Sequence, residues 1–134
     1  MLIGYSNATL NNNYHQWALG RYNLLQAYGD DVLALGSYNA VTADECITIG
    51  HNLLGTTYHA LFGGRYNIGG GSRYAWNANE YLFAMGNGTG TGANANNAIS
   101  IYKNGDAELG DRDASTKPIM KITTADSTTE LIGC

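Results

Sequence analysis

The stretch Tyr14–Asn23 reads YHQWALGRYN, and a second stretch further along the chain, Tyr58–Asn67, reads YHALFGGRYN. The two align without a gap, and six of their ten positions are identical. Each copy has an apolar run before a glycine and an asparagine three residues after that glycine. Internal repetition of this kind indicates a repeat protein, in which each unit is stabilised by stacking on the next.

The same glycine-centred unit occurs six times. Its glycines are Gly4, Gly20, Gly36, Gly50, Gly64 and Gly86, at intervals of 16, 16, 14, 14 and 22 residues. A period of 14–16 residues is too short for helical repeats. It suits one coil of a narrow β-solenoid or β-roll, with short strands and tight corners.

Strands are expected at the apolar runs 17–19, 32–35, 47–49, 60–62 and 81–85, because three to five residues is strand length rather than helix length. The glycines are expected at corners, where a positive φ or the close approach of two coils excludes a Cβ. The asparagine that follows is expected to bond its own backbone or to form a ladder along the axis.

Composition supports an all-β fold in one domain. The chain of 134 residues contains 18 Gly, 10 Tyr and 1 Pro, and only 13% of its residues are charged. Glycine, asparagine and tyrosine favour short strands and frequent turns and disfavour helix.

The repeat ends at Gly86. Residues 87–97 are rich in Gly and Asn and predict a loop, and residues 98–109 predict a β-hairpin around Asn104-Gly105. Two short strands are expected at 118–122 and 129–132, and an inserted surface loop is expected at 69–72. We therefore divide the chain into a solenoid region, 1–86, and a region of loop, hairpin and C-terminal strands, 87–134.

Charge and hydropathy exclude two classes of partner. The net charge is −4, and the 7 Lys and Arg residues are scattered, which argues against nucleic acid. No run approaches the roughly 18 apolar residues of a membrane span. The N-terminus lacks the pattern of a signal peptide, so we expect synthesis in a cytoplasm, and release, if any, by lysis. Cys46 and Cys134 are expected to be free thiols.

A homotrimer, intertwined or side by side, is expected because a coil of this length has a core only one or two side chains wide. Several bulky apolar residues exceed that space, and burial between chains would accommodate them. They are Trp17, Leu24, Leu25, Leu53, Leu54 and Trp76.

Tyr22, Tyr38 and Tyr66 follow their corner glycines by two residues, and Arg21 and Arg65 precede two of them. If the tyrosines point outward, they form an aromatic stripe suited to a sugar ring or a protein partner. Alternatively, they pack between coils or between chains. The arginines would then pair with carboxylates of a neighbouring chain or stack on the rings.

No catalytic residue, metal site or cofactor is expected. The pairs Asp30-Asp31 and Asp44-Glu45 are 14 residues apart and should lie on the same corner of adjacent coils. They are interpreted as a solvated acidic corner, the alternative being a cation site or a glycan-cleaving pair. His15 and His59 share a repeat position and are interpreted as surface or interface residues, the alternative being an ion held by three copies of one histidine on a trimer axis.

The unit of apolar strand, Ala/Thr-Leu/Ile-Gly and polar turn, at about 14 residues per coil, resembles the head repeats of trimeric autotransporter adhesins. Residues 97–110 (NAISIYKNGDAELG) are similar to strand-turn-strand units of bacteriophage tail fibres and spikes. The resemblance implies a left-handed parallel β-roll, with three chains side by side.

The resemblance also implies a non-enzymatic role as a virion component. Such a component would be a short tail fibre, spike, head fibre or decoration protein that contacts other virion proteins and a host-surface glycan. A bacterial adhesin head at the cell surface is the alternative, and a carbohydrate-active enzyme on a β-helix is a third hypothesis. The uneven spacing and the lack of signal, stalk and anchor patterns favour the virion.

Overall fold

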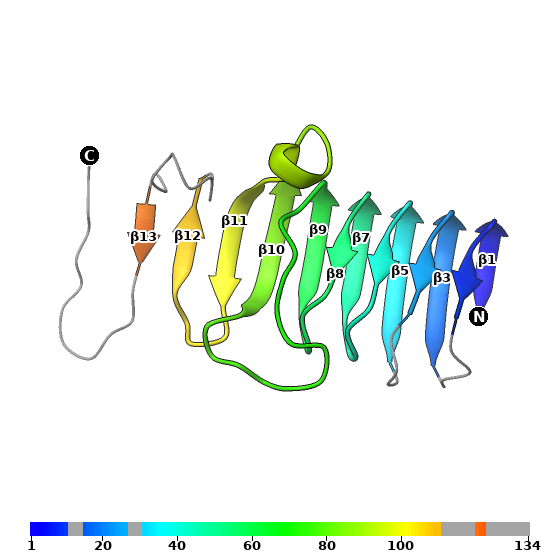
Figure 1. Ribbon diagram of the computed structural model, residues 1–134, viewed down its shortest axis with the longest axis horizontal. Coiled ribbons are helices and arrows are strands. Elements are labelled where there is room, and N and C mark those ends of the chain that lie inside the picture. Colours follow the sequence, from blue (N-terminus) through cyan, green and yellow to red (C-terminus); the bar gives the residue numbers. More distant parts are fainter. Residues whose placement is uncertain (11–14, 27–30, 111–119, 123–134) are drawn as a thin grey trace.

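The structure is a computed structural model that describes residues 1–10, 15–26, 31–110 and 120–122 (Figure 1). It is nearly all β, with a β-solenoid of about 4 turns, which confirms the expected all-β solenoid class. Among the described residues, the single helix is a three-residue 3-10 turn, η1 (Gly92–Asn94). The described part therefore contains no helix long and apolar enough to cross a membrane.

Two sheets form the solenoid. The larger, sheet A, has nine strands in chain order: β1 (Leu2–Tyr5), β3 (Gln16–Arg21), β5 (Val32–Ser37), β7 (Ile47–His51), β9 (Leu61–Arg65), β10 (Tyr81–Asn87), β11 (Asn97–Tyr102), β12 (Ala107–Leu109) and β13 (Met120–Ile122). The smaller, sheet B, has four two-residue strands: β2 (Ala8–Thr9), β4 (Leu24–Leu25), β6 (Ala40–Val41) and β8 (Leu54–Gly55). All pairs in sheet B are parallel.

The sheet changes character after β10. Strands β1 to β10 of sheet A pair in parallel, whereas β11, β12 and β13 continue the same sheet in antiparallel order. The predicted hairpin is present: β11 and β12 pair across Asn104-Gly105, where Gly105 has φ +92°. Residues 120–122 of the expected strand at 118–122 form β13, and the expected strand at 129–132 lies outside the described residues.

The coil that follows each corner glycine leaves no space for a side chain at that position. Gly4, Gly20, Gly36, Gly50 and Gly64 align in register and have φ between +84° and +151°. A Cβ on any of them would lie less than 3.0 Å from the carbonyl oxygen of the next glycine in the column. Gly86 aligns with Gly64 but lacks the positive φ, so its expected equivalence to the other five holds in register only. The parallel stack ends at this strand.

A ladder of asparagine side chains runs through the interior beside the glycines. Asn39 Nδ2 donates to Leu35 O in its own coil (3.1 Å) and to Gly50 O in the next (3.1 Å), so both expected roles occur together. Asn7 and Asn23 likewise reach the next coil. The bonding direction reverses after Leu53, because Asn67 bonds back to the backbone of Leu54.

The core is narrow, but it encloses large apolar side chains. In β3, β5 and β7 the inward row of sheet A holds the small residues Ala18, Ala34 and Thr48, which leave space for leucines, and in β9 it holds Phe62. Leu25 and Leu53 are 0% exposed, so the expectation that both need burial between chains is wrong. Leu24 is half-buried, whereas Trp17, Leu54 and Trp76 are exposed.

Candidate interaction surface

Aromatic rings form a column where the parallel strands of sheet A end, which we call the upper corner because these strand ends lie at the top of Figure 1. The column consists of Tyr5, Tyr22, Tyr38, His51 and Tyr66, with successive ring centroids 5.4, 4.9, 5.7 and 5.4 Å apart. The rings of Tyr22 and Tyr38 are stacked, with an interplanar angle of 18°, and the other neighbours meet edge to face. Each ring therefore contacts the ring of the next coil.

This geometry supports the packing interpretation of the tyrosines. Because Tyr22 and Tyr38 stack on each other, the ring face that each turns toward the other is closed to a sugar. Tyr22, Tyr38 and Tyr66 all have positive φ, which is uncommon for a non-glycine residue. The Arg21 guanidinium lies 6.0 Å from the centre of the Tyr38 ring, whereas Arg65 is exposed at the end of β9.

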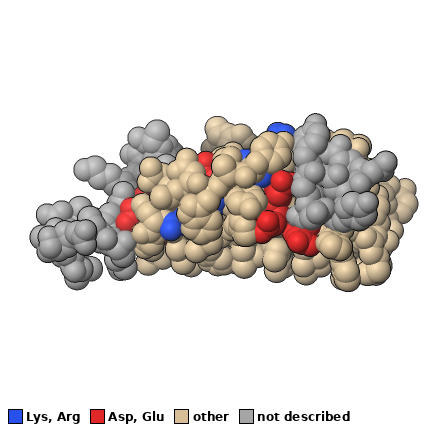
Figure 2. Space-filling view, turned by 90° about the horizontal axis from the view of Figure 1, so that it is seen from below, with Lys and Arg blue, Asp and Glu red and all other residues tan. Residues whose placement is uncertain are grey.

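A second set of equivalent residues lies at the lower corner, where the strands of sheet A begin. His15, Asp31, Glu45 and His59 occupy one position in four successive coils, each with φ between +50° and +63°. Figure 2, seen from below, shows Asp and Glu side chains gathered on this side. Asp31 and Glu45 thus occupy adjacent coils, as predicted, whereas Asp30 lies outside the described residues.

Each of these carboxylates pairs with a histidine. Asp31 Oδ1 lies 3.1 Å from His15 Nδ1, and Glu45 Oε2 lies 2.7 Å from His59 Nε2. The Tyr58 hydroxyl donates to the other Glu45 oxygen (3.2 Å). Within the described residues, no three His, Cys, Asp or Glu side chains gather as metal ligands. The lower corner is thus a row of histidine–carboxylate pairs.

Between the two corners, the outer side of sheet A carries two rows of apolar residues, which we call the apolar face. The first row is Ile3, Leu19, Leu35, Ile49, Gly63, Met85, Ile99 and Leu109. The second row is Trp17, Leu33, Ile47, Leu61, Phe83, Ile101 and Ala107. Neither row contains a charged residue. Trp17 and Leu19 are each 50% exposed, although the residue between them, Ala18, is buried.

The lower corner borders the apolar face directly. One shallow hollow of about 450 Å³ is lined by His15 and Asp31 together with Trp17, Leu33 and Ile47. A second, of about 370 Å³, is lined by Glu45 and His59 together with Leu61 and Phe83. The two hollows repeat one arrangement, in which a histidine–carboxylate pair flanks an apolar floor.

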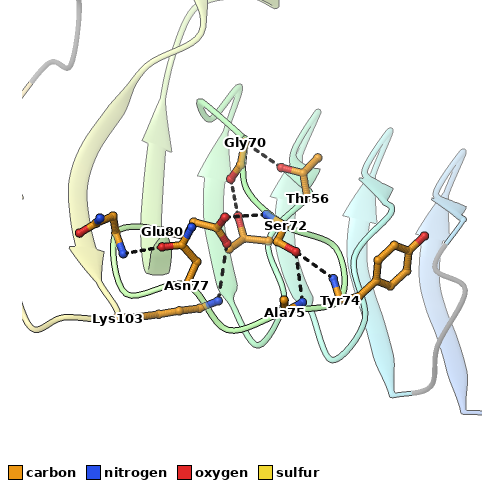
Figure 3. A network of polar contacts seen from close by, with 10 residues as sticks. Thr56, Gly70, Ser72, Tyr74, Ala75, Asn77, Glu80 and Lys103 are labelled. Atoms are coloured by element: carbon orange, nitrogen blue, oxygen red, sulfur yellow. Dashed lines mark hydrogen bonds and ion pairs between the residues drawn. The ribbon is translucent and has the colours of Figure 1, made fainter.

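The inserted loop 66–80 is held against the solenoid (Figure 3). Gly70 N donates to Thr56 Oγ1 (2.6 Å), and Ser72 N donates to Glu80 Oε1 (2.8 Å). Lys103 Nζ lies 3.9 Å from Glu80 Oε2 and 4.9 Å from the centre of the Trp76 ring. Burial lowers the Lys103 pKa, and Glu80 opposes that effect. Sequence reasoning identified the loop but not the lysine that fixes it.

Cys46 is a free thiol in the core, and burial raises its pKa from 9.0 to about 12. Between those values the unfolded chain releases a proton that the folded chain retains. Stability should therefore fall as pH rises, by at most about 1.4 kcal/mol per pH unit. Urea unfolding at several pH values between 9 and 12 measures this slope.

The Cys46→Ala variant is the control, because Ala60 already occupies the equivalent position in the next coil. Its alkaline slope should be shallower than that of the wild type. Equal slopes in the two proteins would contradict the assignment to the thiol. Cys134 lies outside the described residues.

No protein-family model, curated protein or solved structure matches this chain.

Proposed function

We propose that this protein is a structural component of a fibre or spike in a virion, and that it assembles as a homotrimer through the apolar face. The observation that carries the proposal is the two uncharged apolar rows, of which the first continues across β1 to β12 and the second across β3 to β12. Large exposed apolar patches on soluble proteins mark interaction surfaces. An apolar surface of this regularity favours an equally apolar partner, and a second copy of the chain provides one.

The size of the face is adequate for a stable interface. Strands about 4.8 Å apart, crossed by about 20 Å of extended chain, give the sheet a face of several hundred Å². Standard interfaces bury about 800 Å² per partner. One face of this protein thus approaches the area that a specific assembly requires.

The shape of the apolar face favours an assembly of three chains. It is only two side chains wide, so around an axis parallel to the solenoid each row can meet a different neighbour. Such heterologous contacts close into a ring when the rotation permits. Three chains would bury both rows of every copy and leave both sheet B and the loop 66–80 on the outside.

The virion location rests on the resemblance of the repeat and of residues 97–110 to fibre and spike units. A rigid trimeric rod suits a part that holds other virion proteins at a distance. If a host-surface glycan is bound, the exposed tyrosine edges of the upper corner are available for it. We propose that the role is presentation rather than catalysis.

Sedimentation equilibrium tests the proposal. The wild type should have three times the chain mass of 14.3 kDa. The double variant Leu35→Asp/Ile49→Asp places two charges in the middle of the apolar face and should be monomeric. Its far-UV circular dichroism should remain β-type, because neither side chain belongs to the chain's own core.

Leu54→Asp is the matched control, because Leu54 is an exposed leucine on β8, outside the apolar face. It should remain trimeric. A wild type that is monomeric or dimeric at micromolar concentration would contradict the proposed homotrimer.

A further inference from the structure

We infer that the side chains of Lys103 and Glu80 condense to form an isopeptide (amide) bond within the chain, with release of one molecule of water. The bond ties the end of the inserted loop to the end of β11, where sheet A changes from parallel to antiparallel pairing. It lies within a single chain and is independent of how many chains assemble.

The pairing of β10 with β11 brings the two residues together. Glu80 directly precedes β10 and Lys103 directly follows β11, and their neighbours Tyr81 and Tyr102 are partners in the antiparallel register. Lys103 N donates to Glu80 O (3.0 Å), which holds the two backbones next to each other. The two side chains point toward each other, with Lys103 Nζ 3.9 Å from Glu80 Oε2 (Figure 3). Two groups held together in this way react as if in one molecule at very high concentration.

The two groups are buried, and the atoms that face each other lack hydrogen bonds. The side chain of Lys103 is 0% exposed and that of Glu80 is 15% exposed. Among the described residues, neither Lys103 Nζ nor Glu80 Oε2 has a hydrogen-bond partner. The rings of Trp76 and Tyr58, centred 4.9 and 5.8 Å from Nζ, cannot accept a conventional hydrogen bond in place of water. Buried charges without hydrogen bonds are costly, and the condensation removes both charges and removes Oε2 from the chain.

The surroundings of Lys103 favour the neutral amine, which is the form that attacks a carboxyl group. Burial lowers the pKa of Lys103, and the charge of Glu80 opposes that effect. Transfer of a proton from Nζ to Oε2 ends the opposition, because it leaves a neutral amine beside a neutral carboxylic acid. Desolvation in an apolar pocket is a general means of making a lysine nucleophilic.

The inserted loop holds and polarises the carboxyl group of Glu80. Ser72 N donates to Oε1 (2.8 Å), so this oxygen is placed to carry the negative charge of a tetrahedral intermediate. The backbone of Gly71 lies against the other side of the group, where an added Cβ would be 3.1 Å from Cδ and from Oε2. A hollow of about 290 Å³, lined by Glu80, Gly70 and Gly71, gives the released water a way out.

The reaction needs no second reactant. After the proton transfer, the lone pair of Nζ forms a bond to Cδ, and the electrons of the carbonyl double bond move to Oε1. The double bond then forms again, the Cδ–Oε2 bond breaks, and Oε2 leaves as water with two protons that came from Nζ. One ammonium and one carboxylate thus give one amide and one water, and no atom is oxidised or reduced.

Mass spectrometry of the denatured wild type tests the bond. The intact chain should weigh less than its sequence requires by one water molecule, on purification or after incubation of the folded protein. Trypsin should no longer cleave after Lys103 and should release residues 74–112 as one peptide with the same loss. Fragmentation of this peptide should yield no backbone fragments from cleavage between residues 80 and 103, because the bond closes that segment into a ring.

Two variants remove one reacting group each. Lys103→Arg retains the positive charge, but a guanidinium stays protonated and does not attack. Glu80→Ala has no carboxyl group to be attacked. Both should have the full mass of their sequences. Lys121→Arg, which changes a lysine on β13, is the matched control and should lose water like the wild type.

Two results would overturn the inference. One is a wild type that keeps its full mass both when fresh and after incubation in the folded state. The other is a loss of water that persists in Lys103→Arg, since the water would then come from another site. Neither result bears on the proposed homotrimer, which sedimentation equilibrium tests separately.

Discussion

Replacing Gly36 by alanine should prevent the solenoid from folding. Gly36 has φ +114°, a region that is essentially restricted to glycine. An added Cβ would also lie less than 3.0 Å from the carbonyl oxygen of Gly50. Gly50 cannot retreat, because it makes the same close approach to Gly64. The combined cost should exceed about 4 kcal/mol, which is the range of severe packing defects, and circular dichroism with urea unfolding measures it.

The matched control is Gly92→Ala. Gly92 also has a positive φ, +61°, but no atom lies within 4 Å of the position of its added Cβ. This variant carries only the conformational cost, about 1–2 kcal/mol. If the two variants lose similar stability, close contact between coils does not determine the glycine column.

Asn39→Ala should be nearly as damaging. Asn39 is buried, and its side chain accepts a hydrogen bond from Leu53 N (3.0 Å) as well as donating to Leu35 O and Gly50 O. Alanine leaves these groups without that partner in the interior, where an unsatisfied polar group costs about 1–3 kcal/mol. We expect a loss of about 3–5 kcal/mol in the free energy of unfolding.

Asn79→Ala provides the comparison. Asn79 is exposed on the inserted loop, and such surface changes usually stay within about 0.5 kcal/mol. Urea unfolding of both variants therefore separates the ladder from the general effect of removing an amide. Equal losses would show that the asparagine ladder contributes no special stability.

The repeat could be predicted because its signals are local. The glycines mark the strand ends, and the runs before them are the parallel strands of sheet A. Sheet B could not be predicted in the same way, since strands of two residues such as Leu24–Leu25 have no periodicity to detect. Residue type also does not reveal the positive φ of four equivalent residues, because the geometry of the coil imposes it. These residues are His15, Asp31, Glu45 and His59.

The sequence analysis did not predict which side of the sheet A strands faces the core. Trp17-Ala18-Leu19, Leu33-Ala34-Leu35 and Ile47-Thr48-Ile49 all alternate bulky and small residues. Normally the bulky set of an alternating strand faces the core. Here the small set faces inward, because the interior is too narrow for two bulky rows, and the bulky set forms the apolar face. That alternation was the available signal for the candidate interface.

The column of glycines has a consequence for how the rod can change in length. Each coil from Gly4 to Gly64 meets the next through the same glycine contact, so a duplicated or deleted coil leaves that contact in place on either side. One coil of 14 or 16 residues then alters the length by one strand spacing, about 4.8 Å. An insertion of another size cannot join the stack and must leave it, as the loop 66–80 does. The length of the rod therefore changes only by whole coils.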